Sequence, residues 1–192
     1  MRTYSDKVFT GIAKERIDIT DCEFICCTFE KCKLVDCVFI NCVFSECKFV
    51  ECSIANMQVK ESRMSYSSFV KCSLVSIRWK NLQSGSVFYP IEKLDSCYLK
   101  YNEFENMSFK KFDFMQSRIV DSVFVGCNLS ESIMKNCDLK NTEFTDCDLR
   151  KSDFRHASGY NVSLLNNRVK GARFSYPDVL NLLSVFDIGI EK

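Results

Sequence analysis

Residues 22–56 read CEFIC, CTFEK, CKLVD, CVFIN, CVFSE, CKFVE and CSIAN when the chain is cut after every fifth residue. Every block begins with cysteine and carries a large apolar residue at its third position. We call the third residue the centre of its block and the first its minus-two residue. Between Ile19 and Phe174, 30 of 32 centre positions hold a large apolar side chain, and only Ser84 and Gly159 do not.

A period of five fits neither a helix, which repeats every 3.6 residues, nor a strand, which repeats every two. It fits a short extended piece followed by a turn. The minus-two residue and the centre are two positions apart, so an extended backbone points both side chains to the same side. Four blocks then form a square coil, and each centre stacks on the centre four blocks later. The chain is long enough for about eight coils, a rod on the order of 40 Å long.

The interior of so narrow a coil needs one small and one large residue on each side. Twelve of the 13 cysteines are minus-two residues, and 13 of the 17 phenylalanines are centres. Cysteine behaves here as a small buried hydrophobe. The structural ladder predicted for the first coils consists of Cys22, Phe24, Cys27, Phe29, Cys32, Leu34, Cys37, Phe39, Cys42, Phe44, Cys47 and Phe49.

Later blocks show the same pattern with acidic second residues: Cys137-Asp138-Leu139-Lys140-Asn141, Cys147-Asp148-Leu149-Arg150-Lys151 and Ser152-Asp153-Phe154-Arg155-His156. The chain resembles the pentapeptide-repeat proteins, whose unit is a small residue, Asp or Asn, Leu or Phe, and two polar residues. The resemblance covers residues 19–174. It implies an all-β fold, a right-handed quadrilateral parallel β-helix with a short C-terminal helix and strand.

Three segments follow from this pattern. Residues 1–18, with Val8, Phe9, Ile12 and Ile17, are predicted to cover the first coil as an N-terminal cap segment, and 19–174 form the β-helix. Breaker residues fall within 80–93 and 158–170. In 80–93, either a degenerate coil persists with Leu82, Val87 and Tyr89 inward, or a loop replaces three units. A distorted stretch joining two better-formed halves is the favoured alternative.

Residues 175–192 are predicted to cap the last coil. Ser175 is a plausible N-cap, and Val179, Leu182, Leu183 and Phe186 form one apolar stripe of a helix. Asp187–Ile190, which includes Ile188, is predicted to be a short strand. The helix either only caps the coil stack or also forms a homodimer. The segment resembles the C-terminus of the Qnr-type members of the family, which implies the dimer.

Outward β-branched residues are unusually frequent in the first half. Ordinary β-propensity at sheet positions explains them, and the alternative is a partner-binding patch. The candidate patch consists of Val35, Ile40, Val50, Val70 and Val75.

The sequence offers little for catalysis or metal binding. His156 is the only histidine, there is no C-x-x-C spacing, and no glycine-rich phosphate loop is present. Cys26, off the five-residue pattern, is predicted to be a surface thiol. We therefore predict no enzyme, no catalytic or metal-binding residues and no cofactor. The chain has no long apolar run and no signal-peptide core, which predicts a cytoplasmic protein without a membrane segment.

Two functions remain. The first is a non-catalytic scaffold that binds a protein partner through its outer faces. The second is implied by the resemblance to Qnr-type and microcin-immunity proteins: a DNA-mimicking rod that protects DNA gyrase or topoisomerase IV. The net charge is +1, and the two halves are each balanced. This balance argues against direct nucleic-acid binding and also against a DNA mimic.

Overall fold

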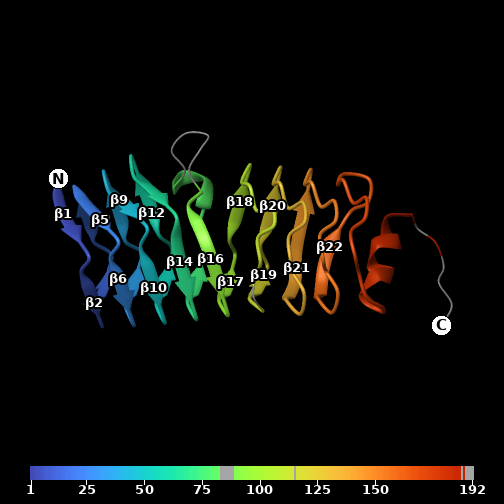
Figure 1. Ribbon diagram of the computed structural model, residues 1–192, viewed down its shortest axis with the longest axis horizontal. Helices are drawn as coiled ribbons and strands as arrows, with labels where there is room; N and C mark the ends of the chain where they lie inside the picture. The colour runs from blue at the N-terminus through green and yellow to red at the C-terminus, as the bar shows by residue number, and fades with distance from the viewer. Residues whose placement is uncertain (83–88, 115, 187, 189–192) are drawn as a thin grey trace.

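The computed structural model describes residues 1–82, 89–114, 116–186 and 188. The chain forms a rod in which short parallel strands of successive coils lie side by side (Figure 1). Strand β1 lies at the N-terminal end of the rod, and the 3₁₀ helix η2 (Asp178–Phe186) lies at the other end. The predicted parallel β-helix is confirmed.

Four sides make up each coil, and the chain visits them in order. Side 1 contains β1 (Arg2–Ser5), β5 (Cys22–Ile25), β9 (Val43–Ser45) and β13 (Arg63–Ser65). Side 2 contains β2 (Val8–Thr10), β6 (Thr28–Glu30), β10 (Lys48–Val50), β14 (Ser67–Val70) and β16 (Ile91–Asp95). Side 3 contains β3 (Ala13–Glu15), β7 (Lys33–Val35), β11 (Ser53–Ala55), β15 (Ser73–Val75), β17 (Tyr98–Lys100) and β19 (Arg118–Val120). Side 4 contains β4 (Asp18–Thr20), β8 (Val38–Ile40), β12 (Gln58–Lys60), β18 (Glu103–Glu105) and β20 (Val123–Val125).

The later coils continue the same four sides with longer strands and isolated bridges. Strand β21 (Asp138–Thr145) bends from side 3 to side 4, and β22 (Ser158–Val162) pairs with it. Side 1 continues through bridges that join Ser108, Asn128, Asp148 and Arg168 in turn. Side 2 continues through bridges that join Asp113, Ile133, Asp153 and Arg173.

The centres form four stacked columns inside the coils. On side 2 the rings of Phe29 and Phe49 are stacked with centroids 4.8 Å apart, and on side 4 Phe104 and Phe124 are 4.4 Å apart. These spacings match the distance between hydrogen-bonded strands. Of the twelve predicted ladder residues, eleven are buried and Cys22 is half-buried.

The minus-two residues are hydrogen-bond donors as well as small fillers. The thiol of Cys47 donates to the carbonyl oxygens of Phe24 (3.4 Å) and Ser45 (3.5 Å). Ser62 and Thr142 make the corresponding bonds with their hydroxyls. Because these bonds join a coil to the one before it, cysteine, serine, threonine and asparagine can replace one another at this position.

The corners between sides have a left-handed backbone. Among the described residues, twenty-six that are not glycine, at most one in each five-residue unit, have φ between 49° and 62°. Such a conformation disfavours L-residues unless the surrounding structure fixes it. Here the backbone N–H of a corner residue donates to the next coil, as Lys31 does to Val50 (2.9 Å), so the coil stack itself holds the conformation.

The N-terminal segment is a full coil rather than a separate cover. Strands β1 to β4 pair with β5 to β8 in the same four-unit register, so the β-helix begins near Arg2 and not at residue 19. The five-residue pattern is hidden in this coil because Lys14 occupies a centre and Arg2 and Lys7 occupy minus-two positions. On the described chain, nothing packs on the outer edge of these strands.

The first predicted break, within 80–93, is an insertion, and after it the chain visits the four sides in the same order as before. Phe69 pairs with Leu94 and Leu74 with Leu99, so the register lengthens here from four units to five. A short 3₁₀ helix, η1 (Trp79–Leu82), buries Trp79 and Leu82 at this point. Tyr89 is exposed rather than inward, and Val87 lies outside the described residues.

The second irregularity is shorter. Asp138 pairs with Ser158 in the regular register, but Thr142 pairs with Tyr160, so the register to β22 slips by two positions between them. The regular register returns where Asp148 bridges Arg168. The five-residue pattern places Gly159 at a centre position, but Gly159 has no side chain to bury. Tyr160, the next residue, is buried instead.

The C-terminal segment caps the last coil, but with a different helix from the one predicted. A 3₁₀ helix has three residues per turn, so Val179 and Leu182 align, and Leu183 and Phe186 belong to a second column. Leu182 is buried, Val179 and Leu183 are half-buried, and Phe186 and Ile188 are exposed. The hydroxyl of Ser175 does not cap the helix and instead accepts the N–H of His156 (3.2 Å). Apart from Ile188, the predicted strand lies outside the described residues.

Candidate interaction surfaces

The outer positions of the coils are the candidate functional surface, because they carry most of the exposed polar and charged side chains of the described residues. In each unit the residue before the centre, the residue after it and the corner residue lie on the outer side of the coil, and most of them are exposed or half-buried. These positions repeat along the rod in columns with the spacing of paired strands. A partner therefore meets straight rows of side chains on flat sides.

The predicted apolar patch is divided among three sides. Val50 and Val70 are register neighbours on side 2. Val35 and Val75 share a column on side 3 with Ala55 between them, and Ile40 lies on side 4. All five are half-buried, as expected for residues whose flanks touch the neighbouring coils. Val50 and Val70 thus form a two-residue apolar row on side 2, and Val35, Ala55 and Val75 form a three-residue row on side 3.

In the second half of the chain, from residue 97 onward, basic and acidic side chains are concentrated on opposite sides of the rod. Each residue is assigned here to the side of its own unit. Sides 1 and 2 carry nine basic and four acidic residues, a net charge of +5; the basic ones are Lys110, Lys111, Lys135, Arg150, Lys151, Arg155, Arg168, Lys170 and Arg173. Sides 3 and 4 carry three basic and six acidic residues, a net charge of −3; the acidic ones are Glu103, Glu105, Asp121, Asp138, Glu143 and Asp146. We call these the basic surface and the acidic surface.

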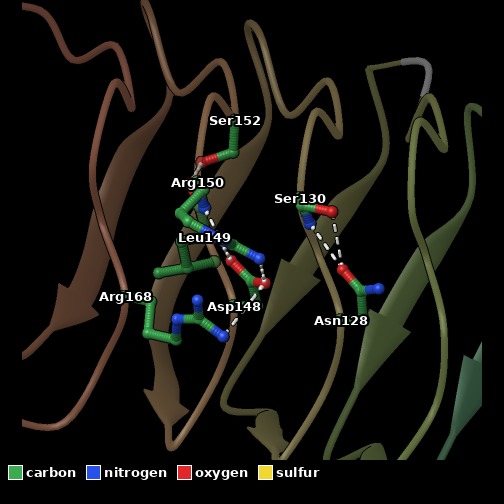
Figure 2. A network of polar contacts seen from close by, with 7 residues as sticks. All are labelled: Asn128, Ser130, Asp148, Leu149, Arg150, Ser152 and Arg168. Carbon is green, nitrogen blue, oxygen red and sulfur yellow. Dashed lines mark hydrogen bonds and ion pairs between the residues drawn. The ribbon is translucent and has the colours of Figure 1, made fainter.

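A network of polar contacts fixes part of the basic surface (Figure 2). Asp148 accepts two hydrogen bonds from Arg150, at 2.8 Å from Nε and 2.5 Å from Nη2, and Arg168 of the next coil lies 3.8 Å away. The hydrogen bonds from Arg150 lower the pKa of Asp148 and keep it ionised. On the preceding coil, Asn128 accepts hydrogen bonds from the N–H and hydroxyl of Ser130.

The same arrangement recurs on side 2. Arg155 donates to Asp153 from Nε (2.9 Å) and Nη2 (2.6 Å), and these bonds lower the pKa of Asp153. Two parallel bonds hold each guanidinium in a fixed plane over its coil. The arginines thus have defined positions, and Lys151 and Lys170 stand beside them without a partner among the described ion pairs.

The acidic surface has an apolar centre. On side 4 the register places Val123 between Glu103 and Glu143, and Val125 between Glu105 and Thr145. Arg78 pairs with Glu103 at 3.1 Å, and Lys80 pairs with Glu105. Glu143 and the corner residue Asp146 are exposed, and neither takes part in a described ion pair.

No described group of three or more His, Cys, Asp and Glu side chains has the arrangement to hold a metal ion. His156 is exposed at a corner of side 2, and Cys26 is an exposed thiol at a corner of side 1. Among the buried thiols, burial raises the pKa of Cys47 to about 12, which disfavours a nucleophilic thiolate. In the part of the chain that the structure describes, no helix is both long and apolar enough to cross a membrane.

The sequence alone did not reveal the two charged surfaces. Asp138, Glu143, Asp148 and Asp153 occupy equivalent positions in consecutive units, and read along the chain they form one acidic series. In the structure each lies on a different side, so only Asp138 and Glu143 belong to the acidic surface. Grouping residues at intervals of four units, with the shift to five at the break, would have found the pattern.

Comparisons with known proteins agree with this architecture. A model described as a pentapeptide repeat region matches residues 93–174, and a model of eight pentapeptide repeats matches residues 22–56. Together they match more than half of the chain. A search of curated proteins finds no significant match.

Several solved structures are similar. QnrB1, a plasmid-mediated fluoroquinolone resistance protein, is 16% identical, with a TM-score of 0.43 over 97% of this chain and 100% of that one. HetL, a protein involved in heterocyst differentiation regulation from the cyanobacterium Nostoc sp. strain PCC 7120, is 11% identical, with a TM-score of 0.38 over 90% and 86%. Rfr23 from the cyanobacterium Cyanothece 51142 is 10% identical, with a TM-score of 0.27 over 91% and 88%.

Solenoids of this kind are generally not enzymes. The repeat, its register in the structure and the two matching models lead to one conclusion: the chain belongs to the pentapeptide-repeat family.

Proposed function

We propose that this protein is a non-catalytic scaffold that binds a protein partner through its outer sides. The observation that carries the proposal is the sorting of charge into a basic and an acidic surface on a rod of nearly zero net charge. Charge that is segregated in this way orients an approaching partner and excludes surfaces of the wrong sign. A protein surface is the expected partner, because the rod is nearly neutral overall and two arginines of the basic surface, Arg150 and Arg155, are already engaged by Asp148 and Asp153.

The test compares capture of partners from cell extract by three double variants. Lys151→Glu with Lys170→Glu lowers the net charge of the basic surface from +5 to +1, and Glu143→Lys with Asp146→Lys changes that of the acidic surface from −3 to +1. Val50→Thr with Val70→Thr removes the apolar row of side 2 and keeps the β-branched shape. We expect one specific partner to be lost with one of the two charge variants and retained by the other. A partner captured equally by all three variants would contradict the proposal.

The second candidate is protection of DNA gyrase or topoisomerase IV. The acidic surface supports it, because a mimic needs only one acidic face and not an acidic chain. In a supercoiling assay with a fluoroquinolone, the unmodified protein should restore activity, and Glu143→Lys with Asp146→Lys should abolish the rescue. Glu131→Gln, on the basic surface, is the matched control and should leave the rescue intact. If the unmodified protein gives no rescue and does not bind gyrase at micromolar concentration, this candidate is rejected and the scaffold proposal stands.

We further propose that the scaffold is a homodimer joined through the C-terminal segment. The exposed apolar side chains of Tyr176, Phe186 and Ile188 at this end of the rod support an apolar contact. A dimer would present two copies of each charged surface to its partner.

A further inference from the structure

An apolar cavity runs inside the first coils from the N-terminal end of the rod. Its volume is about 230 Å³, and inward residues of the first four coils line it. An engineered apolar cavity of about 150 Å³ is large enough to bind benzene and stays free of water. The cavity therefore has room for a small apolar group, and its wall offers such a group almost no polar atoms.

The exposure of the centres shows where the cavity opens. Along side 2, Phe9 is half-buried, and the exposed fraction then falls to 8% at Phe29, 2% at Phe49 and 1% at Phe69. Trp79, which also lines the cavity, is 0% exposed. The cavity thus opens at the first coil and closes near Trp79.

Lys14 gives the open end of the cavity a charge. It stands at a centre position of side 3, where its register neighbour in the next coil is Leu34. A lysine at this position can line the cavity with its aliphatic stem and keep its ammonium in water at the rim. The first coil therefore has three apolar centres, Tyr4, Phe9 and Ile19, instead of four.

The ammonium of Lys14 has no ion-pair partner among the described residues. Its sequence neighbour Glu15 and the corner residue Asp36 of the next coil are both engaged with Arg16, at 3.5 Å and 3.7 Å. An apolar cavity and an unpaired cation thus lie at the same opening.

We propose that this opening binds a medium-chain aliphatic carboxylate, with the chain in the cavity and the carboxylate beside Lys14. The apolar wall selects a hydrocarbon chain, and its lining extends over four coils, from Tyr4 of the first to Trp79 of the fourth. The ammonium selects an anionic head group over a neutral or cationic one. This site is independent of the outer surfaces that carry the proposed scaffold function.

The chain provides its own reporter, because Trp79 is the only tryptophan. We would titrate the full-length protein with octanoate, octanol and octylammonium and follow the fluorescence of Trp79. We expect a saturable change with octanoate and weaker binding of octylammonium. A bromine at the far end of the chain, in 8-bromooctanoate, should quench Trp79 more strongly than one beside the carboxylate, in 2-bromooctanoate.

Two variants and a control locate the binding site. Lys14→Met should weaken octanoate binding roughly fivefold, the effect of losing one exposed ion pair, and leave octanol binding unchanged. Ile12→Phe, at the rim of the cavity, should weaken both ligands. Lys33→Met removes an outward lysine of the next coil and should change neither. Circular dichroism and thermal melting of each variant check that the fold is retained.

Three results would overturn the proposal. The first is a fluorescence change that does not saturate, and the second is equal quenching by the two bromo acids. The third is a mass that doubles with concentration and returns to one chain in Ile12→Phe, with no signal from octanoate. That result would assign this end of the rod to self-association.

Discussion

At the scale of the residue, the minus-two position is defined by a hydrogen bond as much as by size. Ser62 and Ser132 both fill this position and are both buried, but their surroundings differ. Ser62 accepts the N–H of Cys42 at 2.9 Å and donates to a carbonyl oxygen, and the hydroxyl of Ser132 has no partner. Phe112 fills the minus-two position one coil before Ser132, and its N–H donates to the carbonyl oxygen of Phe109 (3.1 Å) instead.

This difference gives a matched pair of mutations. Ser62→Ala leaves the N–H of Cys42 unsatisfied and should destabilise the protein by about 1–3 kcal/mol. Ser132→Ala removes a buried hydroxyl that makes no bond and should change the free energy of unfolding by less than about 0.5 kcal/mol, or increase it. Chemical denaturation measures both. Equal losses would show that size alone defines the position.

The thiols are predicted to differ sharply in reactivity. Cys26 is exposed, and the other described thiols are buried except for the half-buried Cys22. Iodoacetamide should therefore label Cys26 first in the folded protein, and Cys26→Ser should remove this fast reaction. Partial desolvation and repulsion from Glu46 raise the pKa of Cys26, so the labelling rate should increase with pH and level off at a higher pH than for an ordinary cysteine. Rapid modification of many cysteines at neutral pH would contradict the buried ladder.

At the scale of the element, two glycines with the same backbone conformation have different roles. Gly11 and Gly159 have φ of 68° and 72°. A Cβ at Gly11 would meet nothing within 4 Å, and one at Gly159 would lie 2.8 Å from the Cα of Lys140. The slipped register of β22 brings these two backbones together.

Alanine substitutions should separate the two effects. Gly11→Ala should cost about 1–2 kcal/mol, the cost of a left-handed residue alone. Gly159→Ala adds a clash with backbone atoms and should cost clearly more, lowering the melting temperature further. If the two variants melt at the same temperature, the close approach of β22 to β21 is wrong.

The helix at the C-terminus shows where a sequence pattern was insufficient. Apolar residues at intervals of three and four fit an α-helix, but the interval of three from Val179 to Leu182 also fits the narrower 3₁₀ helix. The two helices turn different side chains toward the last coil. The anchor comes from outside the segment, because the carboxylate of Asp178 accepts the N–H of Gly159 at 3.1 Å. No local pattern in 175–192 contains this contact.

At the scale of the whole molecule, a mass measurement distinguishes the two roles of the C-terminal segment, dimerisation and capping of the last coil. Phe186 is exposed, so Phe186→Arg should leave the fold and melting temperature unchanged and reduce the mass in light scattering from two chains to one. Leu182 is buried under the cap, and Leu182→Arg should lower the melting temperature as well. A mass of one chain for the unmodified protein would contradict the dimer.

The five-residue repeat made the fold predictable, but it gave no indication of how charge is distributed over the outer sides. Ladder positions such as Phe44 and Cys47 follow from the five-residue period alone, because every unit contributes the same two inward residues. The basic and acidic surfaces depend on which side each unit faces, and this requires the coil register. That register changes between Phe69 and Leu94, in a segment whose sequence allowed both a coil and a loop. The first coil was missed because Lys14 stands where an apolar centre was expected.

The lengthened register between Phe69 and Leu94 has a consequence for how such a rod can vary. A unit inserted into a regular coil would preserve the ladder but rotate every later unit by a quarter turn, carrying Glu143 from side 4 to side 1 and mixing the two charged surfaces. One extra unit placed outside the coil path avoids that rotation. Length can therefore be added to this molecule without loss of its sidedness only in whole coils of four units or as excursions from the coil. Chains that differ by a single unit within the coil path would share a core but expose different surfaces, and they would therefore bind different partners.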